Sequence, residues 1–202
     1  MKFVKLNINK HDLNKVSELI YETELTIFKQ LLGKDEKEAI QNIKKLIKLG
    51  KNYFGHEHIY VVINEDENIK GILVSFSGRE LSLWNDFKAY FKVLNFYNFL
   101  KCAVKGTLIN ESLTASLGKD DYYLSNVAAD PQFRGQGIGT FILENALKTA
   151  EEKGCSRVLL DVTFDNKGAK RLYERFGFKV YSKKTPKLFK GHGTLNMEYF
   201  ID

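Results

Sequence analysis

Apolar residues recur along the chain with two spacings, one typical of strands and the other of helices. Residues 2–8 alternate between apolar and polar, which predicts an N-terminal strand. The next apolar residues are three and four apart and comprise Leu13, Val16, Leu19 and Ile20. This spacing predicts a helix that begins at Asn9 or Asp12, because both residue types are good N-caps.

A second helix and a hairpin follow. Acidic residues within 35–38 open the helix, and Gly50 ends it. Its apolar face comprises Ile40, Ile43, Leu46 and Ile47. Residues 59–63 and 69–76 are two apolar runs around a polar connection, which predicts a hairpin.

The most informative part of the chain is residues 122–150, where an apolar strand runs directly into a glycine-rich turn that opens a helix. Asp130-Pro131 ends the strand, since proline lacks the amide hydrogen that a ladder needs. The helical face then comprises Ile138, Phe141, Ile142, Ala146 and Leu147. Gly135, Gly137 and Gly139 lie in the first turn of this helix, where a ligand can reach free amide hydrogens and the positive end of the helix dipole. The turn therefore predicts an anion site.

Several interpretations of this turn compete. A Walker loop needs Gly-Lys-Ser/Thr, which the turn lacks, and a dinucleotide fingerprint needs a small residue where Thr140 stands. A third interpretation is a helix that merely starts with several glycines and binds nothing. The spacing Arg134-x-x-Gly137-x-Gly139, after a strand that ends in Asp-Pro, resembles the pyrophosphate loop of the GCN5-related N-acetyltransferase (GNAT) family.

A second block carries the same resemblance. Residues 158–162 predict a buried strand, and Asn166 behind it is a good helix N-cap. A short helical face comprises Ala169, Leu172, Tyr173 and Phe176, and Gly177 can end the helix in a left-handed conformation. An Asn at the strand exit, a small residue and a Leu-Tyr pair followed by Gly-Phe are similar to the other wall of the acyl-CoA cleft in GNAT proteins. The resemblance is strong over roughly residues 122–178.

The resemblance implies an α/β fold with strand, two helices, hairpin, strand, helix, strand, helix and strand in that order. We expect a single GNAT-like domain over residues 1–202, with a mixed, mostly antiparallel sheet of about six or seven strands flanked by helices. The runs 179–182 and 194–201 predict the last strands, joined by an exposed connection over residues 183–193.

Residues 79–118, here called the aromatic segment, depart from the family pattern and predict a helical insertion with residues 106–118 as its return. Its large apolar residues are Trp84, Phe87, Tyr90, Phe91, Leu94, Phe96, Tyr97, Phe99 and Leu100. They either pack the insertion onto the core or form a lid or wall of the acceptor pocket.

The resemblance also implies an N-acetyltransferase that moves an acetyl group from acetyl-CoA to a primary amine of a small molecule or peptide, by direct attack in a ternary complex. It assigns acetyl-CoA contacts to Val127, Ala128, Ala129, Arg134, Gly135, Gln136, Gly137, Ile138, Gly139, Thr140, Asn166, Ala169 and Tyr173. Backbone groups of Val127 and Ala129 would bind the pantetheine arm and the thioester oxygen. Tyr173 would be the general acid for the departing thiolate.

The resemblance leaves the general base and the acceptor amine open. Asp161 is a candidate base, because an acid within an apolar strand is unusual, and burial there also fits a structural hydrogen bond. Glu80 and Glu111, on either side of the aromatic run 84–100, are weaker candidates.

Composition narrows these expectations. The chain is long enough to bury its apolar surface without disulfides or metals. Cys102 and Cys155 lack pairing or metal-ligand spacing, and the histidines lack other ligands, which predicts reduced thiols, a cytoplasmic protein and no metal. Because neither a signal peptide nor a membrane-spanning run is evident, we expect no membrane partner.

The formal net charge of +6 and the pI of about 9.1 suit an anionic ligand such as CoA. The lysines are scattered and no RNA-binding signature occurs, so we expect no nucleic-acid partner. Two alternatives remain as hypotheses, a CoA-binding sensor that keeps the cleft without the reaction and a basic nucleic-acid-binding module. The oligomeric state is open, with a homodimer as one option.

Overall fold

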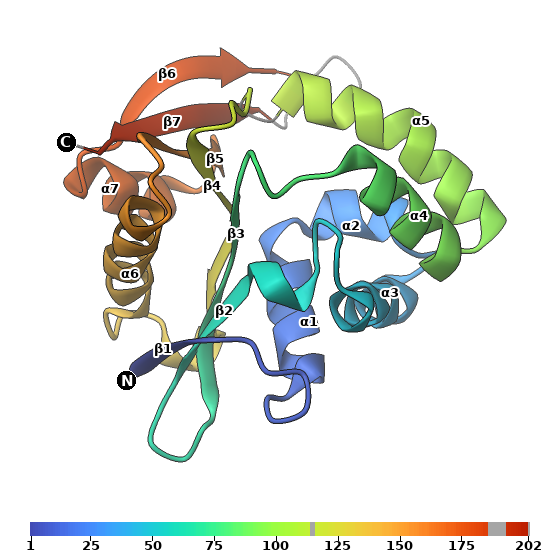
Figure 1. Cartoon of the computed structure of the whole chain (residues 1–202), viewed down its shortest axis with the longest axis horizontal. Coiled ribbons are helices and arrows are strands. Elements are labelled where there is room, and N and C mark those ends of the chain that lie inside the picture. Colours follow the sequence, from blue (N-terminus) through green and yellow to red (C-terminus); the bar gives the residue numbers. More distant parts are fainter. Residues whose placement is uncertain (114–115, 186–192, 202) are drawn as a thin grey trace.

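A seven-stranded sheet forms the centre of the molecule in the computed structural model, with helices on both of its faces (Figure 1). The structure describes residues 1–113, 116–185 and 193–201, and the side chains of all of these except 105–113. The strands are β1 (Lys2–Lys5), β2 (Ile59–Ile63), β3 (Ile69–Ser77), β4 (Asp121–Ala129), β5 (Arg157–Thr163), β6 (Lys179–Lys184) and β7 (Thr194–Phe200). The connection predicted over residues 183–193 lies largely outside the described residues.

The strand order is β1-β2-β3-β4-β5-β7-β6, and β4–β5 is the parallel pair among antiparallel neighbours. The predicted mixed, mostly antiparallel sheet is therefore confirmed. The predicted hairpin strands also agree with β2 and β3, whereas β1 is shorter than expected because it ends at Lys5.

Helices cover the two faces of the sheet separately (Figure 1). One face carries α1 (Leu13–Thr23), α2 (Leu25–Leu31), α3 (Glu36–Leu49), α4 (Leu83–Val93) and α5 (Phe96–Leu113), and the other carries α6 (Ile138–Glu152) and α7 (Lys167–Arg175). Each side has its own cluster of buried apolar residues. The short helix α2 was not predicted, because its seven residues bury only Phe28 and Leu31 and show no clear period.

The helix boundaries follow from local capping. The side chain of Asp12 accepts a hydrogen bond from the backbone N–H of Asn14 at 2.8 Å, so α1 is capped at Asp12 rather than at Asn9. The side chain of Asp35 accepts one from the N–H of Glu38 at 2.8 Å, and Gly50 ends α3 with a φ of 67°. Among the described helices, none is long and apolar enough to cross a membrane.

The aromatic segment forms two helices, α4 and α5. The helix α5 continues to Leu113, so the prediction that residues 106–118 form its return is wrong for residues 106–113. One glycine within a helix costs about 1 kcal/mol and does not by itself end it, which explains why Gly106 misled the prediction.

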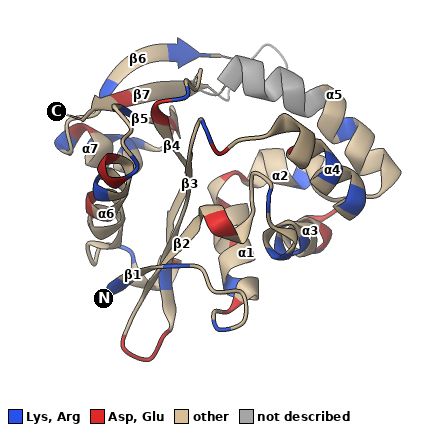
Figure 2. Ribbon diagram, in the orientation of Figure 1, with Lys and Arg blue, Asp and Glu red and all other residues tan. Residues whose placement is uncertain are grey.

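The rings of the aromatic segment divide between two sides. Tyr90 and Phe99 pack against the core, whereas Trp84, Phe91, Phe96 and Tyr97 are 62–75% exposed. The expectation that the aromatic residues pack the segment onto the core therefore holds for only some of them. The cations of this segment with described side chains are Arg79, Lys88, Lys92 and Lys101, and the lysines on α4 and α5 are blue in Figure 2.

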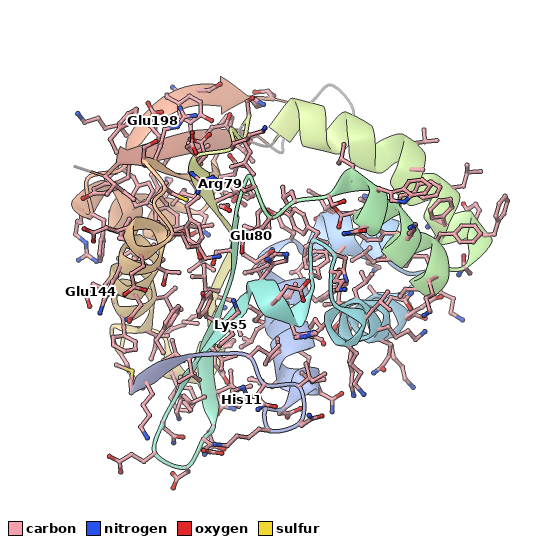
Figure 3. The ribbon with its side chains drawn as sticks, viewed as in Figure 1. Lys5, His11, Arg79, Glu80, Glu144 and Glu198 are labelled. Carbon is pink, nitrogen blue, oxygen red and sulfur yellow. The ribbon has the colours of Figure 1, made fainter. Side chains whose placement is uncertain are left out.

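The strands β4 and β5 are paired over only part of their length. Their register runs from Asp121–Arg157 to Leu124–Leu160 and stops there, although β4 continues to Ala129 beside β3. At the paired end, the Arg157 guanidinium donates two hydrogen bonds of 2.8 Å to the Asp121 carboxylate. It donates a third, of 3.1 Å, to Glu198, which is labelled on β7 in Figure 3. Arg157 thereby clamps β4, β5 and β7 together at this end.

We expect Asp121→Asn to lower the free energy of unfolding at pH 7 by about 2 kcal/mol, because Arg157 then keeps a half-buried charge without its main partner. The hydrogen bonds from Arg157 hold the pKa of the Asp121 carboxyl below its usual 3.8. The stabilisation is therefore complete above that usual value and is lost as the pH falls through the lowered pKa. Urea unfolding at pH 7 and at pH 3 measures both effects.

Asp120→Asn provides the matched control, because Asp120 and its partner Arg79 form an exposed ion pair one residue away. Exposed pairs contribute little to stability. Equal losses of stability in the two variants would contradict the clamp.

Candidate active site

The glycine-rich turn between β4 and α6 leaves backbone amides open. Pro131 begins a short 3-10 helix, and the side chain of Asp130 caps it by accepting from the N–H of Gln132 at 3.0 Å. Gly135 and Gly137 then have φ values of 77° and 78°, in the left-handed region that favours glycine. The helix α6 begins at Ile138 with Gly137 as its N-cap, so Gly135 and Gly137 precede the first turn rather than lying within it as predicted.

Nothing in the described structure blocks this turn. A Cβ atom added at Gly135 or Gly137 would meet no other atom within 4 Å. No described side chain caps the N-terminus of α6, so the N–H groups of Ile138, Gly139 and Thr140 have no capping partner there. Uncapped amides and the positive end of the helix dipole are features that favour an anion at a helix N-terminus.

The helix α7 lies directly against the start of α6. A Cβ atom on Gly139 would come within 2.9 Å of the Leu172 side chain, so the two helices approach closely because residue 139 is glycine. The Asn166 side chain accepts a hydrogen bond from the N–H of Ala169 at 3.1 Å, which confirms the predicted N-cap of α7. The two sequence blocks are therefore brought together in space.

The far end of β4 has no strand partner on its β5 side among the residues that the structure describes. The N–H of Asp130 donates to the carbonyl of Lys70 at 2.9 Å and therefore faces β3. Because amide groups alternate sides along an extended strand, those of Val127 and Ala129 face away from β3, toward the side on which β5 has diverged. Both residues, and Ala128 between them, are half-buried. The predicted pantetheine-binding groups thus lie along the opening between β4 and β5.

The remaining residues of the predicted site are in different surroundings. Arg134 is exposed, and its guanidinium lies 3.8 Å from the Glu22 carboxylate at the end of α1. Gln136 is also exposed. Tyr173 is 6% exposed, and its ring centroid lies 6.0 Å from that of Phe178. Burial raises the pKa of Tyr173 to about 12, so its phenol is protonated throughout the neutral range.

Asp161, the predicted candidate base, is held by hydrogen bonds. Its Oδ2 accepts from the hydroxyl of Tyr123 at 2.6 Å, and its Oδ1 accepts from the amide of Asn196. Glu80 forms an ion pair of 2.7 Å with Lys153 and accepts from the N–H of Ser77. The side chain of Glu111 lies outside the described part of the chain.

Glu24 is an ionisable residue near Asp161 that the sequence analysis missed. It is the half-buried residue between α1 and α2. Burial, followed by the charges of Asp161 and Asp165, raises the pKa of Glu24 to about 7. Such a carboxyl can accept or donate a proton near neutral pH. Among the described residues, no group of three or more His, Cys, Asp or Glu residues is arranged to hold a metal ion.

Comparisons with known proteins bear on the family and the fold of the chain. The model of the Acetyltransferase (GNAT) family matches residues 34–178. The [Ribosomal protein bS18]-alanine N-acetyltransferase of Escherichia coli (strain K12) is 37% identical over 59 residues, which are 29% of this chain and 40% of the relative. The chain thus matches well under two thirds of that relative's length.

Two solved structures share the fold. The N-acetyltransferase from Staphylococcus aureus Mu50 has a TM-score of 0.70 and 19% identity, with 98% of this chain and 100% of that chain covered. The NatC complex bound to Gag peptide and CoA has a TM-score of 0.61 and 14% identity, with 100% of this chain and 98% of that chain covered.

We expect Glu24→Gln to be more stable than the wild type at pH 8.5, by on the order of 2–3 kcal/mol. Because the pKa of Glu24 is raised to about 7 from 4.5, the folded protein carries an increasing penalty as the pH rises from 4.5 through 7. The advantage of the variant should therefore shrink toward pH 5. Urea unfolding at the two pH values measures it.

Glu18→Gln is the control, since Glu18 is exposed on the preceding helix α1 and its replacement should change stability little at either pH. A Glu24→Gln variant with the same stability as the wild type at both pH values would show that Glu24 is an ordinary solvated carboxylate.

Proposed function

The chain belongs to the Acetyltransferase (GNAT) family, and we propose on that basis that it transfers an acetyl group from acetyl-CoA to a primary amine of a small molecule or peptide. Two features of the structure together support the proposal. The helix α6 starts at a glycine without a side-chain cap, and β4 stops pairing with β5 partway along its length. The first feature suits a diphosphate, and the second provides an extended edge for a pantetheine arm.

Acetyl-CoA would bind along these two features in sequence. The diphosphate would accept hydrogen bonds from the N–H groups of residues 138–140, with the exposed Arg134 as a nearby cation. The loop residues Gly135, Gln136 and Gly137 would line it. Asn166 and Ala169 on α7 would line the opposite wall, which the close approach of α7 to Gly139 supports.

The backbone of β4 would align the acetyl group. Val127 and Ala129 would bind the pantetheine arm, and an N–H group of this edge would also polarise the thioester carbonyl. Holding the thioester beside the amine in one ternary complex removes much of the entropic cost of their encounter. The NatC complex, which is bound to both a Gag peptide and CoA, supports a ternary complex of this kind.

Residues of this chain could carry both proton transfers of the reaction, one from the amine and one to the thiolate. The amine nitrogen attacks the thioester carbon, and Glu24, with its pKa of about 7, takes the proton that the nitrogen loses as the N–C bond forms. The C–S bond breaks, and the thiolate receives a hydrogen bond and a proton from Tyr173, which solvent reprotonates. Asp161 would support Glu24 by keeping the pKa of Glu24 high.

Two free cysteines, Cys102 and Cys155, suit the proposed cytoplasmic location.

Thiol release from acetyl-CoA tests the proposal directly, with polyamines, aminoglycosides, amino acids and peptide N-termini as acceptors. Turnover with one class identifies the acceptor. Normal CoA affinity with no turnover on any amine would instead favour a CoA-binding sensor. Absence of CoA binding by calorimetry would end both ideas, and salt-dependent nucleic-acid binding that CoA does not compete with would favour the third hypothesis.

We expect Gly137→Glu to abolish CoA binding, because its carboxylate would stand where a phosphate binds and residue 137 has a left-handed φ. Gly154→Glu is the matched control. Gly154 also has a left-handed φ and open space around it, but it follows the other end of α6. Calorimetry should give near wild-type affinity for the control, and loss of affinity in both variants would point to helix damage instead.

We expect Tyr173→Phe to lower kcat by about a hundredfold with little change in CoA affinity, because the substitution removes only the proton donor. Tyr199→Phe is the control, since Tyr199 belongs to the same ring cluster through Phe178, at a centroid distance of 5.5 Å. Steady-state kinetics and calorimetry separate the two properties. Parallel loss of turnover and CoA affinity in Tyr173→Phe would assign the phenol to binding alone.

A further inference from the structure

We propose that Tyr53 is a positioning residue that holds Glu24 in place through a chain of hydrogen bonds across β4. The proposal rests on the proposed function, because it concerns how the proton acceptor of that reaction is held. Tyr53 lies between α3 and β2 and is distant in sequence from every other member of the chain of hydrogen bonds.

The chain of hydrogen bonds has four steps, each 2.7 Å long. The hydroxyl of Tyr53 pairs with Ser125 Oγ, Ser125 Oγ donates to Asn126 Oδ1, the Asn126 amide donates to Thr23 Oγ1, and Thr23 Oγ1 donates to the carbonyl of Ile20. Because the Ser125 proton is used on Asn126, Tyr53 is the donor in the first step. The bonds therefore all run in one direction, which allows each to strengthen the next.

A bulge in β4 makes this arrangement available. The β3–β4 register shifts between Val74 and Ser75, which pair with Asn126 and Leu124, so Ser125 has no counterpart on β3. The extra residue comes immediately after Leu124, the last residue of β4 that pairs with β5. Bulges commonly re-aim a side chain at such a point. Here Ser125 becomes the link between Tyr53 and the end of α1.

Tyr53 is itself fixed at both ends. Its backbone N–H donates to the Asp86 carboxylate of α4 at 2.6 Å. Its ring lies edge-on to Phe76, with centroids 4.9 Å apart, and to Phe54, at 5.0 Å. Burial raises the pKa of its hydroxyl, so Tyr53 remains a neutral donor. The aromatic segment is thereby connected to the start of the chain of hydrogen bonds.

The other end of the chain of hydrogen bonds is at Thr23, the residue that precedes Glu24. Thr23 is the last residue of α1, and Glu24 separates it from α2 with a φ of −146° and a ψ of 52°. The groups that interact electrostatically with Glu24 are Asp161 and Asp165 from the β5 side, Tyr53 and Tyr123. If Thr23 is released, Glu24 can turn toward water, which lowers its pKa and moves it away from the amine.

Two substitutions break the chain of hydrogen bonds at opposite ends. Tyr53→Phe removes the first donor, and Thr23→Val removes the hydroxyl that accepts from Asn126, whereas Thr23→Ser keeps that hydroxyl. We expect the first two variants to lower kcat about tenfold with the KM for acetyl-CoA within about twofold of wild type. The acid limb of their kcat profile should move from near pH 7 toward lower pH, because Glu24 becomes less buried.

Controls separate this role from general stability. Thr23→Ser should restore the wild-type profile, and Tyr97→Phe, which removes an exposed phenol from α5, should leave it unchanged. Hydrogen exchange adds a measurement that needs no turnover, and the amides of residues 20–25 should exchange faster in Tyr53→Phe and Thr23→Val than in Thr23→Ser.

An unchanged acid limb with unchanged exchange at residues 20–25 would overturn the proposal, and so would a Thr23→Ser variant as impaired as Thr23→Val. If Tyr53→Phe does not fold, the comparison of Thr23→Val with Thr23→Ser is by itself enough to test the proposal. A wild-type protein without turnover on any amine would refute the proposed function, and the exchange comparison would still decide whether Tyr53 holds this junction.

Discussion

The parallel ladder between β4 and β5 is short, and its early end determines where a ligand could lie across the sheet. Four residues of each strand pair, from Asp121–Arg157 to Leu124–Leu160, and Arg157 clamps that end to the Asp121 carboxylate. Beyond Leu124 the ladder with β5 ends while the ladder with β3 continues. The sheet is therefore interrupted between β4 and β5 beyond Leu124, while β4 stays in the sheet through its pairing with β3.

Two chemically different regions lie along β4, one at its C-terminal end and the other in its middle. The C-terminal end of β4 leads to the left-handed glycines and the uncapped start of α6, which suit phosphate oxygens. The middle of β4 carries the Ser125 bulge and lies near Glu24, whose raised pKa suits proton exchange with an amine. An acyl-CoA molecule bound along β4 would therefore have its diphosphate at the first region and its thioester at the second.

Local features of the sequence could be predicted because neighbouring residues cause them. The N-caps at Asp12, Asp35 and Asn166 and the glycines at the start of α6 depend on contacts within a few residues. Glu24 and Tyr53 were missed because their roles depend on partners far along the chain, such as Ser125, 72 residues from Tyr53. A Ser-Asn pair within an otherwise apolar strand was the visible signal, and its partners could not be predicted without the fold.

A crystal structure of the protein with CoA would show whether β4 and the start of α6 form the binding site. We expect the diphosphate at the N–H groups of residues 138–140 and the pantetheine arm hydrogen-bonded to the backbone of Val127 and Ala129, between β4 and β5. The CoA sulfur should then point toward the side of the sheet that holds Glu24. CoA bound elsewhere on the molecule, with the space between these strands filled by protein side chains, would rule this site out.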